Sequence, residues 1–218
     1  MEQSFERDTS SFDRALAFFD SVYGFALTLL VVNIDVTGAK TWSSVSALLS
    51  ANGTQFTSFA ISFVVIVAFW RLNHGLVARM TGLDGPVVVA NIVVIGLVVF
   101  MPFTTEAMGD PQLSHLPLPT ALYALNVAGA TIASVVMFEV ALRHGLVAGD
   151  DPRAAARSGT FEALGKATVF LLSIPVTYAG VALWGTTTPG KVFWLSLFLV
   201  APAVSLMARR HPTVEQRT

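Results

Sequence analysis

The chain has 218 residues, of which 54% are hydrophobic and 12% carry a charge, and its formal net charge is −1. Soluble domains carry about 25% charged residues, so this deficit places the chain among integral membrane proteins. The near-zero net charge argues against a nucleic-acid partner, which requires a basic face, and the absence of cysteine excludes disulfides, thiolate metal sites and cysteine nucleophiles.

The first segment, residues 1–11, is polar and of mixed charge, and it lacks the apolar core of a cleavable signal peptide. Residues 12–208 are expected to form one membrane domain, because they contain six apolar runs that reach or approach the ~20 residues needed to cross a bilayer. The runs predict an all-α, polytopic membrane protein with six transmembrane helices, at residues 15–34, 59–77, 87–103, 118–142, 167–184 and 192–208. Residues 209–218 are expected to form a C-terminal tail.

The distribution of Lys and Arg predicts the orientation of these helices. The side that would hold both termini carries most of the basic residues: Arg7, Arg14, Arg79, Arg143, Arg153, Arg157, Lys166, Arg209, Arg210 and Arg217. The opposite side carries only Lys40 and Lys191. Because cytoplasmic loops are enriched in Lys and Arg, both termini are expected to be cytoplasmic.

The connection between the first two helices, residues 36–57, is long and contains Trp42, Val45, Leu48 and Leu49. This spacing would place one apolar face on a short helix that lies on the outer membrane surface. An ordinary loop with one membrane-anchoring tryptophan explains the same residues equally well, and the sequence leaves both alternatives open.

Ionisable residues stand at the cytoplasmic ends of the first two predicted helices. Arg14 and Asp20 belong to the first helix, and Arg71 and His74 follow Trp70 on the second. Because charges are costly in lipid, such residues are expected to face protein or water. Asp20 can accept a hydrogen bond either from His74 or from the indole N–H of Trp70. Arg14 is expected to join the polar network around Asp20, whereas the Arg71 side chain is expected to extend to the lipid headgroups.

The outer half of the first helix carries Phe25, Thr28, Leu29 and Val32, which the helical period places on one face. By spacing alone, such a stripe is more typical of a lipid-facing or core surface than of a functional one. Asp35 at the outer end of this helix fits a solvated helix end slightly better than a functional site. Composition and spacing therefore predict a six-helix membrane protein with a polar cluster on its cytoplasmic side.

A resemblance adds to this prediction. The stretch from Arg14 to Asp20 reads Arg-Ala-Leu-Ala-Phe-Phe-Asp. It resembles the Arg-x-x-x-Phe-Ser-Asp signature of the transmembrane protein 175 family of potassium channels, with Phe18 at the signature phenylalanine. Phe19 replaces the signature serine, and we expect it to fill a hydrophobic gap.

Two further motifs are similar to those of this family. The second helix contains Trp70 followed closely by His74, and the third helix ends with Phe-Met-Pro-Phe at residues 100–103. The resemblance covers the first three helices by motif and the remainder by topology. A single repeat of six helices resembles the bacterial form of the family.

The resemblance implies a homotetramer in the bacterial inner membrane, in which four copies of the first helix surround a pore for potassium and other monovalent cations. The family lacks a backbone-carbonyl filter, and this chain likewise contains no Thr-Val-Gly-Tyr-Gly segment. The implied narrow point is Phe25, with Thr28 as the next polar layer and further apolar rings at Leu29 and Val32. Apolar rings stop ions by excluding water. Four copies of Asp35 would give the pore a negative outer mouth.

The resemblance also implies a scaffold at the base of the pore helix, formed by Arg14, Phe18, Asp20, Trp70 and His74. These residues would fasten the first helix to the second and thereby fix which face of the first helix points at the pore. Permeant potassium ions and membrane lipid are the expected partners, with no cofactor and no metal site.

Other function classes have weaker support in the sequence. A secondary transporter of a small cation or solute is the main alternative, but no inverted repeat and no paired broken helices are visible. A membrane enzyme would need a catalytic motif such as His-Glu-x-x-His or Gly-x-Ser-x-Gly, and neither occurs. A small structural or assembly protein would show no ion flux.

Overall fold

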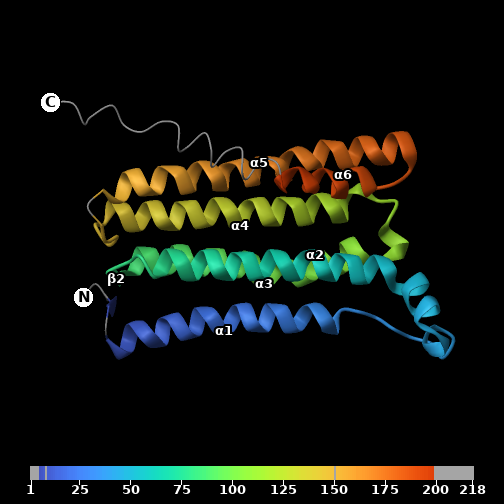
Figure 1. Ribbon diagram of the computed structural model, residues 1–218, viewed down its shortest axis with the longest axis horizontal. Coiled ribbons are helices and arrows are strands. Elements are labelled where there is room, and N and C mark those ends of the chain that lie inside the picture. The colour runs from blue at the N-terminus through green and yellow to red at the C-terminus, as the bar shows by residue number, and fades with distance from the viewer. Residues whose placement is uncertain (1–4, 8, 150, 199–218) are drawn as a thin grey trace.

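The computed structural model describes residues 5–7, 9–149 and 151–198, and within them five helices are long and apolar enough to cross a membrane (Figure 1). These are α1 (Ser10–Val32), α2 (Val45–Val77), α3 (Gly85–Gly109), α4 (Pro117–Arg143) and α5 (Pro152–Trp184). A short helix α6 (Thr188–Phe193) and three 3-10 turns complete them: η1 (Thr41–Ser43), η2 (Pro111–Leu113) and η3 (Trp194–Ser196). The first part of the predicted sixth span, residues 192–198, is helical. Its remainder, residues 199–208, and the predicted tail, residues 209–218, lie outside the described residues.

Two helices begin well before the apolar runs that predicted them. α2 starts at Val45 because the Ser44 hydroxyl accepts a hydrogen bond from the Ala47 N–H at 3.1 Å and caps the helix. α5 starts at Pro152, and proline is favoured in the first helical turn. The connection at residues 36–57 therefore differs from both alternatives, since most of it forms the first turns of α2. Hydropathy predicts the part of a helix inside lipid and misses its polar extension.

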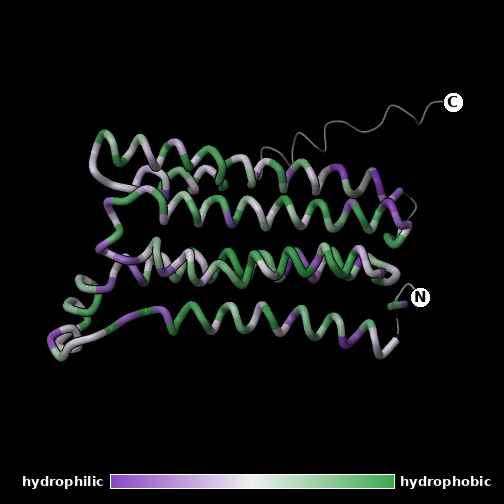
Figure 2. Tube along the Cα trace, turned by 180° about the vertical axis from the view of Figure 1, so that it is seen from behind, coloured by the Kyte–Doolittle hydropathy of each residue, from purple (hydrophilic) through white to green (hydrophobic). Residues whose placement is uncertain are grey.

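The helices run along one common axis, with α1 at one edge of the bundle, α2 and α3 beside it, then α4, and α5 with α6 at the other edge (Figure 1). α4 packs along α3 and α5, and α1 packs against α2 and α3. Apolar residues predominate along the helices, as Figure 2 shows. The buried face of α1 carries Phe19, Tyr23, Ala26 and Leu30, which belong to the main apolar core. The opposite face of α1 has no neighbour in the described part of the subunit.

The N-terminal segment is part of a small sheet. β1 (Phe5–Glu6) pairs antiparallel with β2 (Gly82–Leu83), which lies in the connection between α2 and α3. The Arg7 guanidinium donates hydrogen bonds to the carbonyls of Ala78 and Met80 at 2.6 and 2.9 Å. A Cβ at Gly82 would lie 2.9 Å from the Phe5 carbonyl oxygen, so only glycine fits this pairing. The start of α1 is therefore attached to the α2–α3 connection.

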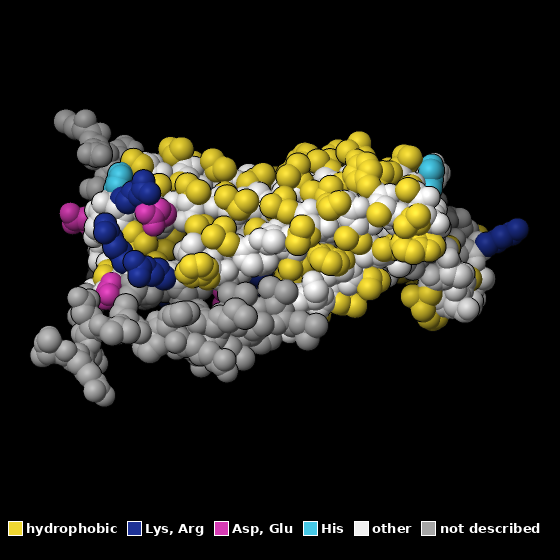
Figure 3. All heavy atoms as spheres, turned by 90° about the horizontal axis from the view of Figure 1, so that it is seen from above, with side chains coloured by type: hydrophobic (Ala, Val, Ile, Leu, Met, Phe, Trp, Pro, Cys, Tyr) yellow, Lys and Arg dark blue, Asp and Glu magenta, His cyan; other side chains and the backbone are white. Residues whose placement is uncertain are grey.

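We call the end of the bundle that carries β1 and β2 the strand end, and the opposite end the distal end. Basic and acidic side chains gather at the strand end, while hydrophobic side chains cover the length of the bundle (Figure 3). This separation is expected for helices whose middle parts lie in lipid.

Candidate functional site

The uncovered face of α1 is the first feature of the site. Side chains at alternating spacings of four and three residues are exposed along it, and we call them the outer row: Arg14, Phe18, Ser21, Phe25, Thr28 and Val32 on α1, followed by the exposed Asp35 in the connection just beyond it. Leu29 is exposed beside them. The Phe25 and Val32 side chains are 70% and 73% exposed. Large apolar side chains alone would be ordinary on a lipid-facing helix, but this row also carries charges and hydroxyl groups.

The two hydroxyl groups of the outer row are oriented by the backbone. Thr28 Oγ1 donates to the Phe25 carbonyl at 2.8 Å, and Ser21 Oγ donates to the Ala17 carbonyl at 2.7 Å. Because the hydroxyl proton is directed inward, the oxygen lone pairs remain available as acceptors. A hydroxyl in this state can accept a hydrogen bond from water or coordinate a cation.

Asp20 lies at the contact between α1 and α2. Its Oδ1 accepts a hydrogen bond from Trp70 Nε1 at 3.0 Å, while its Oδ2 lies 3.8 Å from His74 Nδ1. The ring centroids of Trp70 and His74 are 5.9 Å apart. Of the two partners that the sequence left open for Asp20, the indole makes the hydrogen bond and the imidazole makes a longer electrostatic contact.

The other two residues of the expected scaffold lie elsewhere. Arg14 is exposed and makes no hydrogen bond or ion pair within the described part of the chain, and Phe18 is also exposed. Phe19, at the place of the signature serine, is buried in the core. The structure therefore brings together Asp20, Trp70 and His74, and directs Arg14 and Phe18 to the outer row.

Two buried polar contacts were missed by the sequence reasoning. Asn73 Nδ2 donates to Asn91 Oδ1 at 2.5 Å, and this pair joins α2 to α3. Nearer the distal end, Ser62 donates to the Tyr123 hydroxyl at 3.1 Å and lies 2.7 Å from the Thr105 hydroxyl. A polar residue inside an apolar run indicates that a buried polar contact exists. Its partner depends on how the helices are rotated about their axes, which a hydropathy pattern does not show.

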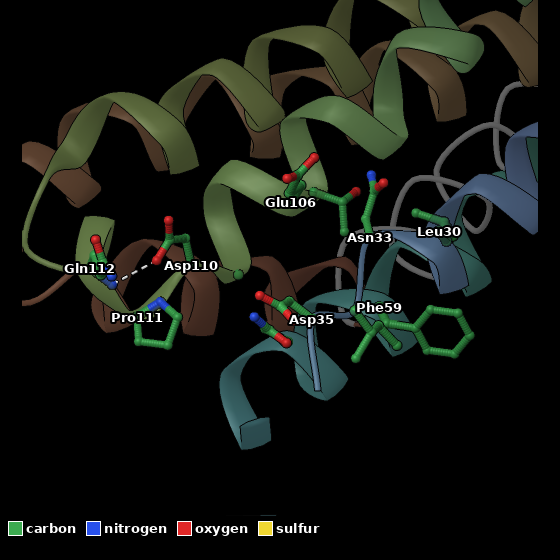
Figure 4. A pocket seen from close by; sticks show the side chains of 12 residues that line it. Leu30, Asn33, Asp35, Phe59, Glu106, Asp110, Pro111 and Gln112 are labelled. Atoms are coloured by element: carbon green, nitrogen blue, oxygen red, sulfur yellow. Dashed lines mark hydrogen bonds between the residues drawn. The ribbon is translucent and has the colours of Figure 1, made fainter. Parts of the chain in front are cut away.

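A pocket of about 330 Å³ opens at the distal end, between the ends of α1, α2 and α3 (Figure 4). Asp35, Glu106 and Asp110 are among its lining residues. The Asp35 carbonyl accepts a hydrogen bond from Asn52 Nδ2 at 2.7 Å, which fixes the chain beyond α1. Within the described residues, no three His, Cys, Asp or Glu side chains converge as they would around a metal ion.

A carboxylate–imidazole pair stabilises the strand end. Asp84 caps α3 by accepting a hydrogen bond from the Val87 N–H at 3.0 Å, and its second oxygen contacts His144 Nδ1 at the end of α4. Burial alone would raise the pKa of the Asp84 carboxyl, but the Val87 hydrogen bond and the neighbouring His144 outweigh it, so the pKa is lowered. The charged form of Asp84 therefore stabilises the folded protein.

Asp84→Asn should lower the free energy of unfolding by about 1 kcal/mol near neutral pH. Asparagine keeps the helix cap, so the loss reports the charge. The pKa of Asp84 is lower in the folded protein, so this contribution is present above the unfolded pKa of about 3.9 and is lost as pH falls through the folded value. Thermal unfolding from about pH 7 to about pH 3 should show the two proteins converging at the acid end.

Glu139→Gln provides the matched control for this measurement. Glu139 pairs with Arg143 at 2.8 Å, but both side chains are exposed, and such pairs contribute about 0–1 kcal/mol. Parallel pH curves for wild type and Asp84→Asn would contradict the role assigned to the Asp84 charge.

Comparison with known proteins identifies the family. The family model described as the endosomal/lysosomal potassium channel TMEM175 matches residues 14–102. A potassium channel of Chamaesiphon minutus is 31% identical over 145 residues, which cover 65% of this chain and 69% of that protein. The chain belongs to the TMEM175 family.

Other relatives of the TMEM175 family align over a smaller share of their length. Potassium channels of Chryseobacterium sp. and Streptomyces collinus are 25% and 27% identical over 130 and 124 residues. These alignments cover 60% and 55% of this chain, and the chain spans only 65% and 59% of the two relatives' own length.

Two solved TMEM175 structures share the fold. The homologue from Chamaesiphon minutus superposes with a TM-score of 0.68 at 23% identity, covering 92% of this chain and 99% of that one. A variant of the potassium channel MtTMEM175, in complex with a nanobody–MBP fusion protein, gives 0.64 at 17% identity, with 94% and 95% covered. The predicted helical membrane fold is thus confirmed, and the family is one of ion channels rather than enzymes.

The match to the TMEM175 family model coincides with the site. Residues 14–102 contain the outer row up to Val32, the Asp20–Trp70 hydrogen bond and the Asn73–Asn91 pair. The remaining helices, α4 and α5, are related to the family's structures by their fold.

Proposed function

We propose that this chain is the subunit of a potassium-permeable cation channel that conducts passively through a central pore. The observation that carries the proposal is the outer row of α1, where large apolar side chains, hydroxyls and charges alternate on a face that no described residue covers. In a homotetramer, four such faces would surround a common axis. The relatives named as potassium channels support this assignment.

The constriction is proposed at Phe25, with Leu29 and Val32 as further apolar rings towards the distal end. An apolar ring imposes a barrier because a hydrated cation loses water contacts there without replacement. Thr28 lies between these rings, and its lone pairs are free to replace part of the ion's water shell. The proposed path therefore alternates apolar barriers with one acceptor layer.

The Asp20–Trp70–His74 cluster is proposed to hold the base of the pore helix against α2. The hydrogen bond between Asp20 and Trp70 supports this role, since it fixes the rotation of α1 about its own axis. Arg14 and Phe18 have a different proposed role. Because both lie on the outer row, they would contact neighbouring copies of α1 at the strand end.

The channel is proposed to lie in the cell membrane of a bacterium with the strand end in the cytoplasm, since basic side chains concentrate there. Both termini would then be cytoplasmic, and Asp35 would lie at the outer mouth. Residues 12–208 would form the channel domain, with residues 192–208 as the last transmembrane helix.

Potassium flux into liposomes that contain the purified full-length protein tests the proposal. We expect flux that grows linearly with the driving force, from a particle whose mass by native mass spectrometry equals four chains. Flux that saturates with potassium and requires a proton gradient would instead indicate a secondary transporter. Absence of flux from a correctly folded tetramer would contradict conduction altogether.

A further inference from the structure

Tyr23 and Asn91 are among the buried side chains that have a polar atom without a partner in the described residues. The Tyr23 side chain on α1 is 1% exposed and Asn91 on α3 is 0% exposed. Neither the Tyr23 hydroxyl nor Asn91 Nδ2 makes a hydrogen bond within the described residues. A buried donor without a partner destabilises the folded state, because its hydrogen bond to water is lost without replacement, and lipid offers no alternative partner. These two donors therefore require an acceptor.

The two donors lie at the same depth in the bundle. α1 and α3 run in the same direction, and Asn33 Nδ2 on α1 donates to the Pro102 carbonyl on α3 at 3.1 Å. Ten residues before this contact, the two helices carry Tyr23 and Ile92, the neighbour of Asn91. Tyr23 lies on the face of α1 that is buried in the core with α3. The register therefore places the Tyr23 and Asn91 side chains at the same depth in the bundle core.

The surrounding hydrogen bonds define what the two donors need. Asn91 Oδ1 already accepts from Asn73, so only the Asn91 amide N–H groups remain free. Asp20, one helical turn from Tyr23, has its Oδ1 bound by Trp70, while its Oδ2 lies 3.8 Å from His74, beyond hydrogen-bond distance. The junction thus holds two free donors and one free acceptor.

We propose that an ordered water molecule binds at this junction of α1, α2 and α3. Its oxygen accepts hydrogen bonds from the Tyr23 hydroxyl and Asn91 Nδ2, and one of its protons is donated to Asp20 Oδ2. A cation does not fit, because the Asn91 Nδ2 amide is a donor only and directs its protons at the site, and an anion does not fit beside the Asp20 carboxylate. Buried waters typically make about three hydrogen bonds of this kind. The water joins α3 to the Asp20–Trp70 pair, and this role does not depend on ion conduction.

The chain contains three tyrosines, which form a matched set for testing the water site. Tyr23→Phe removes the proposed water ligand, Tyr123→Phe removes the direct hydrogen bond with Ser62, and Tyr178→Phe removes an exposed hydroxyl on α5. Thermal unfolding of the full-length protein in detergent should show Tm lowered by about 2–4 °C for Tyr23→Phe and Tyr123→Phe, with little change for Tyr178→Phe. If no water binds the Tyr23 hydroxyl, Tyr23→Phe removes a buried polar group that has no partner, and Tm should be unchanged or higher. Such a result would overturn the proposal.

A density map of the wild-type protein at a resolution that shows water provides the second measurement. We expect a peak within hydrogen-bond distance of both Tyr23 Oη and Asn91 Nδ2. A map without this peak overturns the proposal even if Tyr23→Phe lowers Tm or fails to fold.

Discussion

Replacing Phe25 with alanine should raise potassium flux by about tenfold, which corresponds to a barrier lowered by ~1.4 kcal/mol. Four phenyl rings at the proposed constriction exclude water, and four methyl groups leave a wider neck that stays hydrated. The Phe25 side chain makes few contacts within its own subunit, since it is 70% exposed, so the change should not unfold the protein. Flux into liposomes from matched amounts of wild-type and variant tetramer measures the effect. Selectivity between potassium and sodium should fall in the same variant.

Two controls sharpen the Phe25 experiment. Phe161→Ala removes an equally large and comparably exposed ring from α5, at the opposite edge of the bundle, and should leave flux unchanged. Phe25→Asn also widens the neck and adds a polar group, so it should raise flux at least as much as alanine does. Wild-type flux in both Phe25 variants would place the pore away from α1.

Asp20→Ala should reduce both the stability of the subunit and the yield of tetramer. The change leaves the Trp70 indole N–H without its acceptor and removes the carboxylate near His74. Because the site is partly exposed, we expect a loss of about 1–2 kcal/mol in the free energy of unfolding, at the lower end for hydrogen bonds to charged groups. Potassium flux per tetramer should fall several-fold, since the rotation of α1 that directs Phe25 at the proposed pore axis would no longer be fixed. Thermal unfolding, size-exclusion chromatography and liposome flux measure these effects.

Substitutions around Asp20 separate its hydrogen bond from its charge. Asp20→Asn keeps a carbonyl acceptor for the indole and should retain most of the stability, while Trp70→Phe should reproduce much of the loss. Combining Asp20→Ala with Trp70→Phe should cost less than the sum of the single changes, because both remove one interaction. Asp13→Ala, an exposed carboxylate in the first turn of α1, is the control for loss of charge. A fully stable and conducting Asp20→Ala protein would refute the scaffold role.

The bundle was largely predictable because lipid imposes simple rules on sequence. A spanning segment must be apolar and helical, so the runs that begin near Ala15 and Val87 identified α1 and α3 directly. The early start of α2 was not predictable from hydropathy, since it depends on the cap at Ser44. β1 was missed for a similar reason. β1 and β2 have two residues each, which is too short for a periodic pattern in the sequence. Their pairing also depends on the close contact between the backbones of Phe5 and Gly82.

The candidate site was predicted in part, and helix geometry explains the division. Asp20 could only be paired with residues at its own depth in the membrane, which are those near the end of the second helix. Of these residues, Trp70 donates the hydrogen bond to Asp20. Arg14 was expected in the same cluster, but residues six apart on a helix point about 120° away from each other. When Asp20 faces α2, Arg14 therefore faces outward. The Asn73–Asn91 pair depends on the relative rotation of α2 and α3, which a single sequence does not encode visibly.

The attachment of α1 at both ends limits how such a channel can open. At the strand end, Arg7 and β1 bind the α2–α3 connection, and at the distal end Asn33 binds the Pro102 carbonyl. An iris-like motion that slid or twisted α1 alone would have to break both attachments at once. In the proposed pore, widening would therefore come from rotamer changes of Phe25, or from α1, α2 and α3 tilting together as one rigid unit against α4 and α5.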